Sequence, residues 1–118
     1  MIKGIGLDIV ELERIKKAME RTERFQKRIL SERELEVFSK LSNKRKLEYL
    51  AGRFAAKEAF SKANGTGIGE GCEFYQIEIL NNELGKPELY FDGQAVNGFV
   101  SITHSRDYAC AQVIIMNS

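Results

Sequence analysis

A carboxylate interrupts the apolar side of a helix that we expect from about residue 43 to residue 63. At about 100° per residue, Glu58 points only about 20° away from Leu47, in line with the other apolar side chains of that face. A carboxylate on a face meant for burial is costly unless another group compensates it. Lys62 follows one turn later, which allows a structural Glu58–Lys62 ion pair at positions i and i+4. The spacing leaves this structural pair and a functional site equally open.

A second carboxylate, Asp8, interrupts the apolar run that opens the chain. It follows Gly4 and Gly6, a Gly-x-Gly spacing that lets a backbone or a ligand come close. Asp8 and Glu11 also have the spacing of a capping box, and Asp8 taken alone is more typical of a helix cap. If Asp8 and Glu58 instead meet, their hard oxygens suit Mg²⁺, which commonly binds one or two carboxylates together with water and substrate phosphates.

The elements that position these carboxylates are indicated by periodicity and turn residues. Residues 2–10 form an apolar, β-branched run short enough for a strand, and helical spacing begins at Leu12. A capping-box pattern at Ser31 starts a second helix, and four glycines within residues 64–71 end the third. Further strands are expected at residues 74–80, 88–91, 99–104 and 108–116. Helices grouped before strands predict an α+β fold in which the N-terminal strand can join the later antiparallel sheet.

Composition indicates one small globular domain. The 118 residues, 43% of them hydrophobic, fit a single domain over residues 1–118. No apolar run approaches the roughly 20 residues that cross a bilayer, and Asp8 stands where a signal peptide would still be apolar. Cys72 and Cys110 lack the spacing of a disulfide framework or a zinc site, and the single histidine, His104, has no spaced partners. We therefore expect a cytoplasmic protein without a membrane partner.

Basic residues are concentrated in the first half of the chain. Residues 1–64 contain 16 Lys and Arg against 10 Asp and Glu, whereas residues 65–118 contain 2 against 7. The basic half suggests an anionic partner or ligand. Because the net charge is only +1, broad binding to duplex nucleic acid is not expected. For any single basic residue, solvation of a helix face is the commoner explanation.

Two motifs resemble those of the 4′-phosphopantetheinyl transferases. One is Gly6-Leu7-Asp8 with Arg14, and the other is residues 53–62, Arg-Phe-Ala-Ala-Lys-Glu-Ala-Phe-Ser-Lys. Their order and separation are similar to the short class of that family, the holo-[acyl-carrier-protein] synthases. The resemblance extends to Thr103-His104-Ser105 and so covers nearly the whole chain. Either motif alone is weak, and the two together are strong.

The resemblance implies transfer of 4′-phosphopantetheine from coenzyme A to a serine of apo acyl carrier protein, with release of adenosine 3′,5′-bisphosphate, for fatty acid biosynthesis. It implies that Asp8 and Glu58 hold a Mg²⁺ ion that neutralises the transferring group. Glu58, directly or through a metal-bound water, is the first candidate base. Lys62 would neutralise the diphosphate or protonate the leaving side. Asp8, Glu58 and Lys62 are thus the expected catalytic residues.

The resemblance also implies two binding surfaces. The residues expected to contact coenzyme A are Lys44, Arg45, Arg53, Lys57, Lys62, Gly65, Thr66, Gly85, Lys86, Pro87, Thr103, His104 and Ser105. A basic stripe at i, i+3, i+7 and i+10 of the first helix, with apolar neighbours, fits docking of an acidic carrier protein. The residues expected to dock the carrier are Arg14, Lys17, Met19, Arg21, Arg24 and Phe25.

The expected assembly follows from the longer members of the superfamily, which resemble two tandem copies of this fold with the site between them. A single copy is therefore expected to form a homotrimer with sites between subunits, as the short class does. Val10 stands where the longer class has a further acidic ligand, so water or substrate would complete the metal shell.

Two other functions fit part of the pattern. A non-catalytic module would bind an acidic protein or RNA through Arg14, Arg21, Arg24 and residues 44–46, but the two carboxylates then have no role. A small hydrolase would act on nucleotides with the same metal pair.

Overall fold

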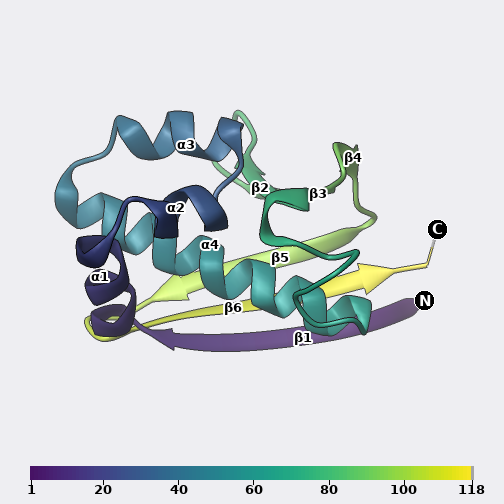
Figure 1. The fold of residues 1–118 in the computed structure, drawn as a ribbon. Coiled ribbons are helices and arrows are strands. Elements are labelled where there is room, and N and C mark those ends of the chain that lie inside the picture. Colours follow the sequence, from purple (N-terminus) through teal and green to yellow (C-terminus); the bar gives the residue numbers. More distant parts are fainter. Residues whose placement is uncertain (118) are drawn as a thin grey trace.

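A long helix, α4 (Asn43–Asn64), lies on the larger of two antiparallel sheets in the computed structural model, which describes residues 1–117 (Figure 1). The larger sheet has the order β1–β6–β5, formed by Ile2–Glu11, Tyr108–Met116 and Gly98–His104. The smaller sheet, β2–β3–β4, is formed by Ile77–Asn81, Pro87–Phe91 and Gln94–Ala95. The remaining elements are α1 (Leu12–Arg21), α2 (Arg24–Ile29), α3 (Glu32–Ser39) and the 3₁₀ helix η1 (Phe74–Gln76). In Figure 1, α3 and the smaller sheet lie across α4 from the larger sheet.

The N-terminal strand belongs to the sheet made by the C-terminal strands. β1 pairs antiparallel with β6, and Asp8 lies opposite Ala111. This confirms the α+β class and the expectation that the first strand joins the later sheet. Among the helices of residues 1–117, none combines the length and apolarity needed to span a membrane.

β1 and α4 touch through their backbones. A Cβ atom at Gly6 would lie 1.7 Å from the Ala59 carbonyl oxygen, and one at Gly4 would lie 2.0 Å from the Ala63 carbonyl oxygen. Only glycine fits at such positions. The close approach expected from the Gly-x-Gly spacing is thus made by a helix backbone. Because strand side chains alternate, Asp8 lies on the same face of β1 as both glycines.

α4 is buried on most of its circumference rather than along one apolar stripe. Its buried residues include small ones such as Ala55 and Ala59 and also the charged Arg53 and Lys57. The helix lies between the larger sheet and α3, which explains why polar positions are buried as well (Figure 1). It ends at Gly65, which adopts the left-handed conformation with φ of 86°.

The first helical region is divided into two helices. α1 ends at Arg21, and Arg24 begins α2, a six-residue helix that the periodicity did not reveal. The prediction of one continuous basic stripe from Arg14 to Arg24 was therefore wrong at its last member. Residues 74–76 form η1 rather than the start of a strand, and β4 was not predicted.

The two predicted capping boxes have different outcomes. The Ser31 side chain accepts from the Glu34 backbone N–H and the Glu34 side chain accepts in return, which confirms the start of α3. Asp8, in contrast, lies inside β1, and Glu11 occupies the N-cap position of α1. The helix-cap interpretation of Asp8 was therefore wrong, because the strand continues past it.

Candidate functional site

The two carboxylates singled out in the sequence lie on elements that pack against each other. Lys62 Nζ of α4 lies 3.1 Å from Asp8 Oδ1 of β1 and 2.9 Å from the Leu7 carbonyl oxygen. The Asp8 side chain is 15% exposed and that of Lys62 is 51% exposed. Lys62 therefore pairs with Asp8 across the β1–α4 contact. Within residues 1–117, the alternative Glu58–Lys62 ion pair is not formed.

Glu58 lies close enough to Asp8 for the two charges to interact. Partial burial raises the pKa of Glu58, the Asp8 carboxylate raises it further, and Lys62 and Arg14 lower it. Two carboxylates that repel each other form a favourable place for a divalent cation. In the part of the chain that the structure describes, no three or more His, Cys, Asp or Glu side chains cluster as a metal site.

Glu58 lines a cavity of about 540 Å³, which we call the Glu58 pocket. Its other walls include Arg14, Lys17 and Arg21 from α1 and Phe25 from α2. Four of the six residues expected to dock the carrier therefore share a pocket with the expected base. The pocket combines cationic side chains with aromatic and aliphatic walls.

The other two predicted carrier-docking residues lie elsewhere. Met19 lines a separate cavity of about 450 Å³ together with Lys44, and Arg24 lies outside the lining of the Glu58 pocket. Arg28, which was not predicted, does line it. Arg28 follows Arg21 by seven residues, as Arg21 follows Arg14, and this repeat was the signal that would have identified it.

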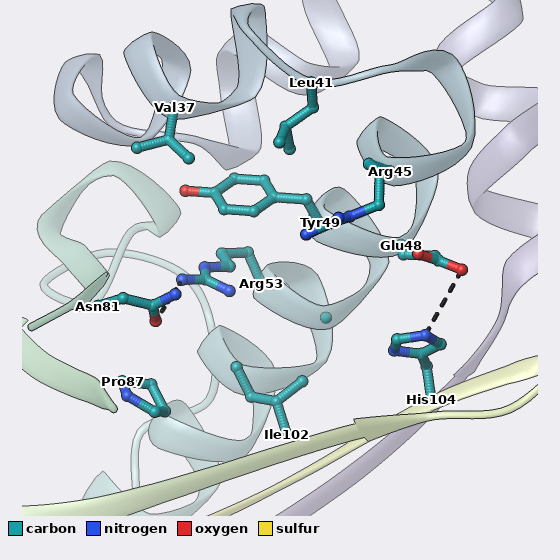
Figure 2. Close-up of a pocket in the computed structure, with 11 residues that line it drawn as sticks. Val37, Leu41, Arg45, Glu48, Tyr49, Arg53, Asn81, Pro87, Ile102 and His104 are labelled. Atoms are coloured by element: carbon teal, nitrogen blue, oxygen red, sulfur yellow. Dashed lines mark hydrogen bonds and ion pairs between the residues drawn. The ribbon is translucent and has the colours of Figure 1, made fainter. Parts of the chain in front are cut away.

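A second cavity, of about 320 Å³, gathers four of the residues expected to bind coenzyme A. Arg45 and Arg53 extend from α4, and Pro87 and His104 come from β3 and β5. Figure 2 shows these side chains around the Tyr49 ring, and the Arg53 guanidinium carbon lies 4.3 Å from the centroid of that ring. We call this cavity the Arg53 pocket.

Arg53 is held firmly in its pocket. It is 8% exposed and donates from Nη2 to the Ile79 carbonyl oxygen at 3.2 Å and to Asn81 Oδ1 at 3.3 Å. At the other side of the pocket, His104 Nε2 lies 3.5 Å from Glu48 Oε2 (Figure 2). Glu48 was not predicted, and it lies one residue before Tyr49 in the part of α4 that lines the pocket.

The backbone N–H groups of the glycine-containing turns donate hydrogen bonds within the chain. Gly65 N–H donates to the Lys62 carbonyl and Gly85 N–H donates to the Asn82 carbonyl, while Thr66 N–H also donates into the end of α4. A Cβ at Gly65 or Gly85 would meet nothing within 4 Å. These turns therefore provide open surface for close approach rather than free N–H donors.

The remaining predicted residues lie outside both named pockets. The Lys86 ammonium lies 5.7 Å from the centroid of the Phe99 ring. Thr103 is exposed on β5, and Ser105 Oγ accepts from the Tyr108 backbone N–H at 3.2 Å in the turn that follows. Within one chain, these residues are not gathered with Glu58.

The prediction that Lys57 contacts a phosphate of coenzyme A was wrong. Its side chain is 0% exposed, and its ammonium donates to the Ile29 carbonyl, the Phe74 carbonyl and Glu34 Oε1. A lysine has three donors, so none is left for a phosphate. Burial lowers the pKa of Lys57, and the Glu34 carboxylate opposes that shift. The residue is part of the core, and its acceptors come from distant segments that the sequence could not bring together.

Comparisons with known proteins agree over nearly the full length. A sequence profile described as the 4′-phosphopantetheinyl transferase superfamily matches residues 4–113. A protein from Geobacillus sp. (strain WCH70) named holo-[acyl-carrier-protein] synthase is 58% identical over 115 residues, which is 98% of this chain and 97% of that protein. A protein of the same name from Listeria monocytogenes serotype 4a (strain HCC23) is 53% identical over 116 residues, 98% of each chain. The crystal structure of a holo-(acyl-carrier-protein) synthase from Bacillus anthracis str. Ames in complex with CoA (3′,5′-ADP) matches with a TM-score of 0.89 and 48% identity, covering 100% of this chain and 99% of that one.

Proposed function

Because this chain belongs to the 4′-phosphopantetheinyl transferase superfamily, we propose that it transfers 4′-phosphopantetheine from coenzyme A to a serine of an acyl carrier protein. The observation that carries the proposal is the meeting of Asp8, Glu58 and Lys62 beside a pocket with cationic walls. Such a group can bind a diphosphate and accept a proton at one place. The biological setting that we propose is fatty acid biosynthesis in the cytoplasm.

Asp8 and Glu58 are the residues that would hold Mg²⁺. Their fit to the ion is supported by the raised pKa of Glu58, to which the Asp8 carboxylate contributes, because a divalent cation relieves repulsion between two hard anionic ligands. When bound, the ion would neutralise charge on the diphosphate. Water and substrate phosphates are expected to complete its shell.

Glu58 is the proposed base. Before a metal ion binds, the raised pKa of Glu58 makes its carboxylate a better proton acceptor than an ordinary one. The carrier serine hydroxyl gives its proton to Glu58 while its oxygen attacks the phosphorus bonded to pantetheine. The bond from that phosphorus to the bridging oxygen breaks, and adenosine 3′,5′-bisphosphate leaves. Lys62, half exposed beside Asp8, would stabilise the negative charge of the departing phosphate.

The Arg53 pocket is proposed to bind the nucleotide half of coenzyme A. Arg45, Arg53 and His104 place up to three cationic groups around one cavity, which suits a 3′-phosphate. Lys44 lies beside Arg45 at the start of the same helix and would add charge at the rim. The exposed turns at Gly65-Thr66 and Gly85-Lys86-Pro87, with Thr103 and Ser105, are proposed to border the ligand.

The Glu58 pocket is proposed to receive the carrier protein. Arg14, Lys17 and Arg21 would orient its acidic surface, and Phe25 would contact apolar side chains. Arg14→Glu is expected to raise the KM for the carrier about tenfold with little change in the KM for coenzyme A. An unchanged KM for the carrier would contradict this docking surface.

The outer face of the larger sheet is proposed to form a homotrimer. Leu7 and Ile9 alternate with the glycines that face α4, so they point away from the helix, and they are 57% and 63% exposed. Phe99 extends this face, because both Phe99 and Ile5 pair with Ile114. Apolar patches of this kind mark interfaces. A neighbour docked there would supply Lys86, Thr103 or Ser105 to a shared site.

The experiment that tests the function is incubation of the purified chain with coenzyme A, Mg²⁺ and an apo acyl carrier protein. A mass gain of one phosphopantetheine on the carrier, which is lost when its serine is replaced by alanine, supports transfer. Release of adenosine bisphosphate without a carrier would instead indicate a hydrolase. If neither product forms, the chain is instead a non-catalytic binding module.

A further inference from the structure

A buried ion pair lies next to the proposed base. Lys57 directly precedes Glu58 in the chain, and the side chains of Lys57 and Glu34 are both 0% exposed. Besides Glu34, Lys57 Nζ donates to the Ile29 carbonyl oxygen at 2.7 Å and to the Phe74 carbonyl oxygen at 3.0 Å. The proposed reaction does not use this ammonium, because no substrate reaches it.

The Glu34 carboxylate also has its partners. It accepts from the Ser31 N–H at 2.9 Å and from the Ile79 N–H at 2.8 Å in addition to Lys57. The pair thereby ties the start of α3 and strand β2 to the middle of α4. A buried charge pair with its donors and acceptors satisfied makes a rigid junction.

The bonds of Lys57 end on the walls of the Glu58 pocket. Ile29 and Phe74, whose carbonyls accept from Lys57, both line this pocket together with Glu58. Ile29 ends α2 and Phe74 begins η1, so one ammonium joins two walls from different segments to the helix that carries the base. Neither residue lines the Arg53 pocket.

We propose that Lys57 is a positioning residue for the transfer reaction, holding the Ile29 and Phe74 walls of the Glu58 pocket in place relative to Glu58. This inference rests on the proposed function. A role in stability alone would change the amount of folded protein. A positioning role changes turnover of the folded protein and leaves coenzyme A binding in the other pocket nearly unchanged.

The main test is the double variant Lys57→Met/Glu34→Gln. Lys57→Met alone would leave the Glu34 carboxylate buried without its cation and is expected to be strongly destabilised. The double variant removes both charges and keeps similar volumes, and the amide oxygen of the new side chain can still accept from the Ile79 N–H. Urea unfolding measures its stability, and initial rates at varied coenzyme A and varied carrier give kcat and both KM values.

The expected result is a folded double variant with kcat lowered about ten- to a hundredfold and a KM for coenzyme A within about threefold of wild type. The matched control is Arg33→Met, which breaks the 2.6 Å ion pair between Arg33 of α3, 56% exposed, and Glu78 of β2, 12% exposed. That control is expected to keep kcat within about twofold. A folded double variant with wild-type kcat would overturn the proposal.

A second variant guards against failure of the first to fold. Glu34→Asp keeps the charge but shortens the side chain by one methylene, so Lys57 cannot keep all three bonds at once. It is expected to lower kcat about fivefold or more at an unchanged KM for coenzyme A. Both variants are assayed with trimethylamine N-oxide, which favours folded states. If neither folds even then, the pair is purely structural and the proposal is wrong. Transfer by the wild-type chain in the same assay tests the proposed function separately.

Discussion

The two faces of strand β1 are built in opposite ways. On the inner face, Gly4 and Gly6 leave no room for a methyl group against the backbone of α4, and Asp8 follows in the same row. On the outer face, Leu7 and Ile9 are more than half exposed. The inner face is completed by the chain itself, whereas the outer face is an apolar surface suited to a partner.

The row of Gly4, Gly6 and Asp8 on the inner face of β1 also explains where the proposed active site lies. The two glycines let α4 approach β1 so closely that Ala59 lies directly against Gly6. The neighbours of Ala59 along the helix, Glu58 and Lys62, are thereby brought to Asp8. Backbone contact and a charged site are thus two consequences of one close packing. Substitutions on each face can test this contrast between an inner face that is closed and an outer face that is open.

The largest expected effect is that of Gly6→Val on the inner face. Because a Cβ there would lie 1.7 Å from the Ala59 carbonyl oxygen, β1 and α4 must separate, and we expect a loss of more than about 4 kcal/mol in the free energy of unfolding. Gln94→Val places the same side chain at an exposed position of β4 and is expected to change that energy by less than about 0.5 kcal/mol. Urea titration measures both. A stable, active Gly6→Val protein would mean that the close approach is not required.

Glu58→Gln is expected to remove activity but not the fold. Since the proposed base is lost, kcat should fall about 10²- to 10⁴-fold, while circular dichroism and binding of coenzyme A in the Arg53 pocket remain. Glu36→Gln, an exposed position on α3, is the control and should keep wild-type turnover. Full activity in Glu58→Gln would exclude Glu58 from the mechanism.

Several elements were predictable because they rest on local pattern. The alternation and flanking turn of β6 predicted its bounds, residues 108–116, as they are observed. α4 was predicted to within one residue at its end, because Gly65 stops it. α2 was missed because six residues carry little periodicity and because the basic spacing of α1 continues in the sequence through Arg24.

The site was predictable in its charges but not in its pairings. The exceptional carboxylates Asp8 and Glu58 were identified from their apolar surroundings. That Lys62 pairs with Asp8 follows from the packing of β1 on α4, which no local pattern contains. Lys57 was misjudged for the same reason. Its acceptors, such as the Phe74 carbonyl, are backbone groups that only the folded chain brings to it.

A smaller effect is expected from Leu7→Glu on the outer face. A charge at this exposed position should leave the folded chain intact but oppose apolar association. Light scattering should then show a monomer for the variant and the proposed trimer for the wild type, with a raised KM of the variant for coenzyme A if a neighbour completes the site. A wild-type protein that is already monomeric at micromolar concentration would contradict the proposed assembly.

The smallest expected effect concerns the stability of the inner face without metal. Because the folded state raises the pKa of Glu58, it holds that proton more tightly than the unfolded chain does. Protonation therefore favours folding, and this contribution is gained as pH falls through the raised pKa and is absent at neutral pH. In EDTA at neutral pH, Glu58→Gln should thus be slightly more stable than the wild type, by less than about 1 kcal/mol because Glu58 is only partly buried and solvent screens its charge. The difference should shrink as pH falls towards 4, and Mg²⁺ should stabilise only the wild type. If Glu58→Gln is instead less stable at neutral pH, the Glu58 carboxylate contributes to the packing of the inner face and is not a functional charge held there at a cost.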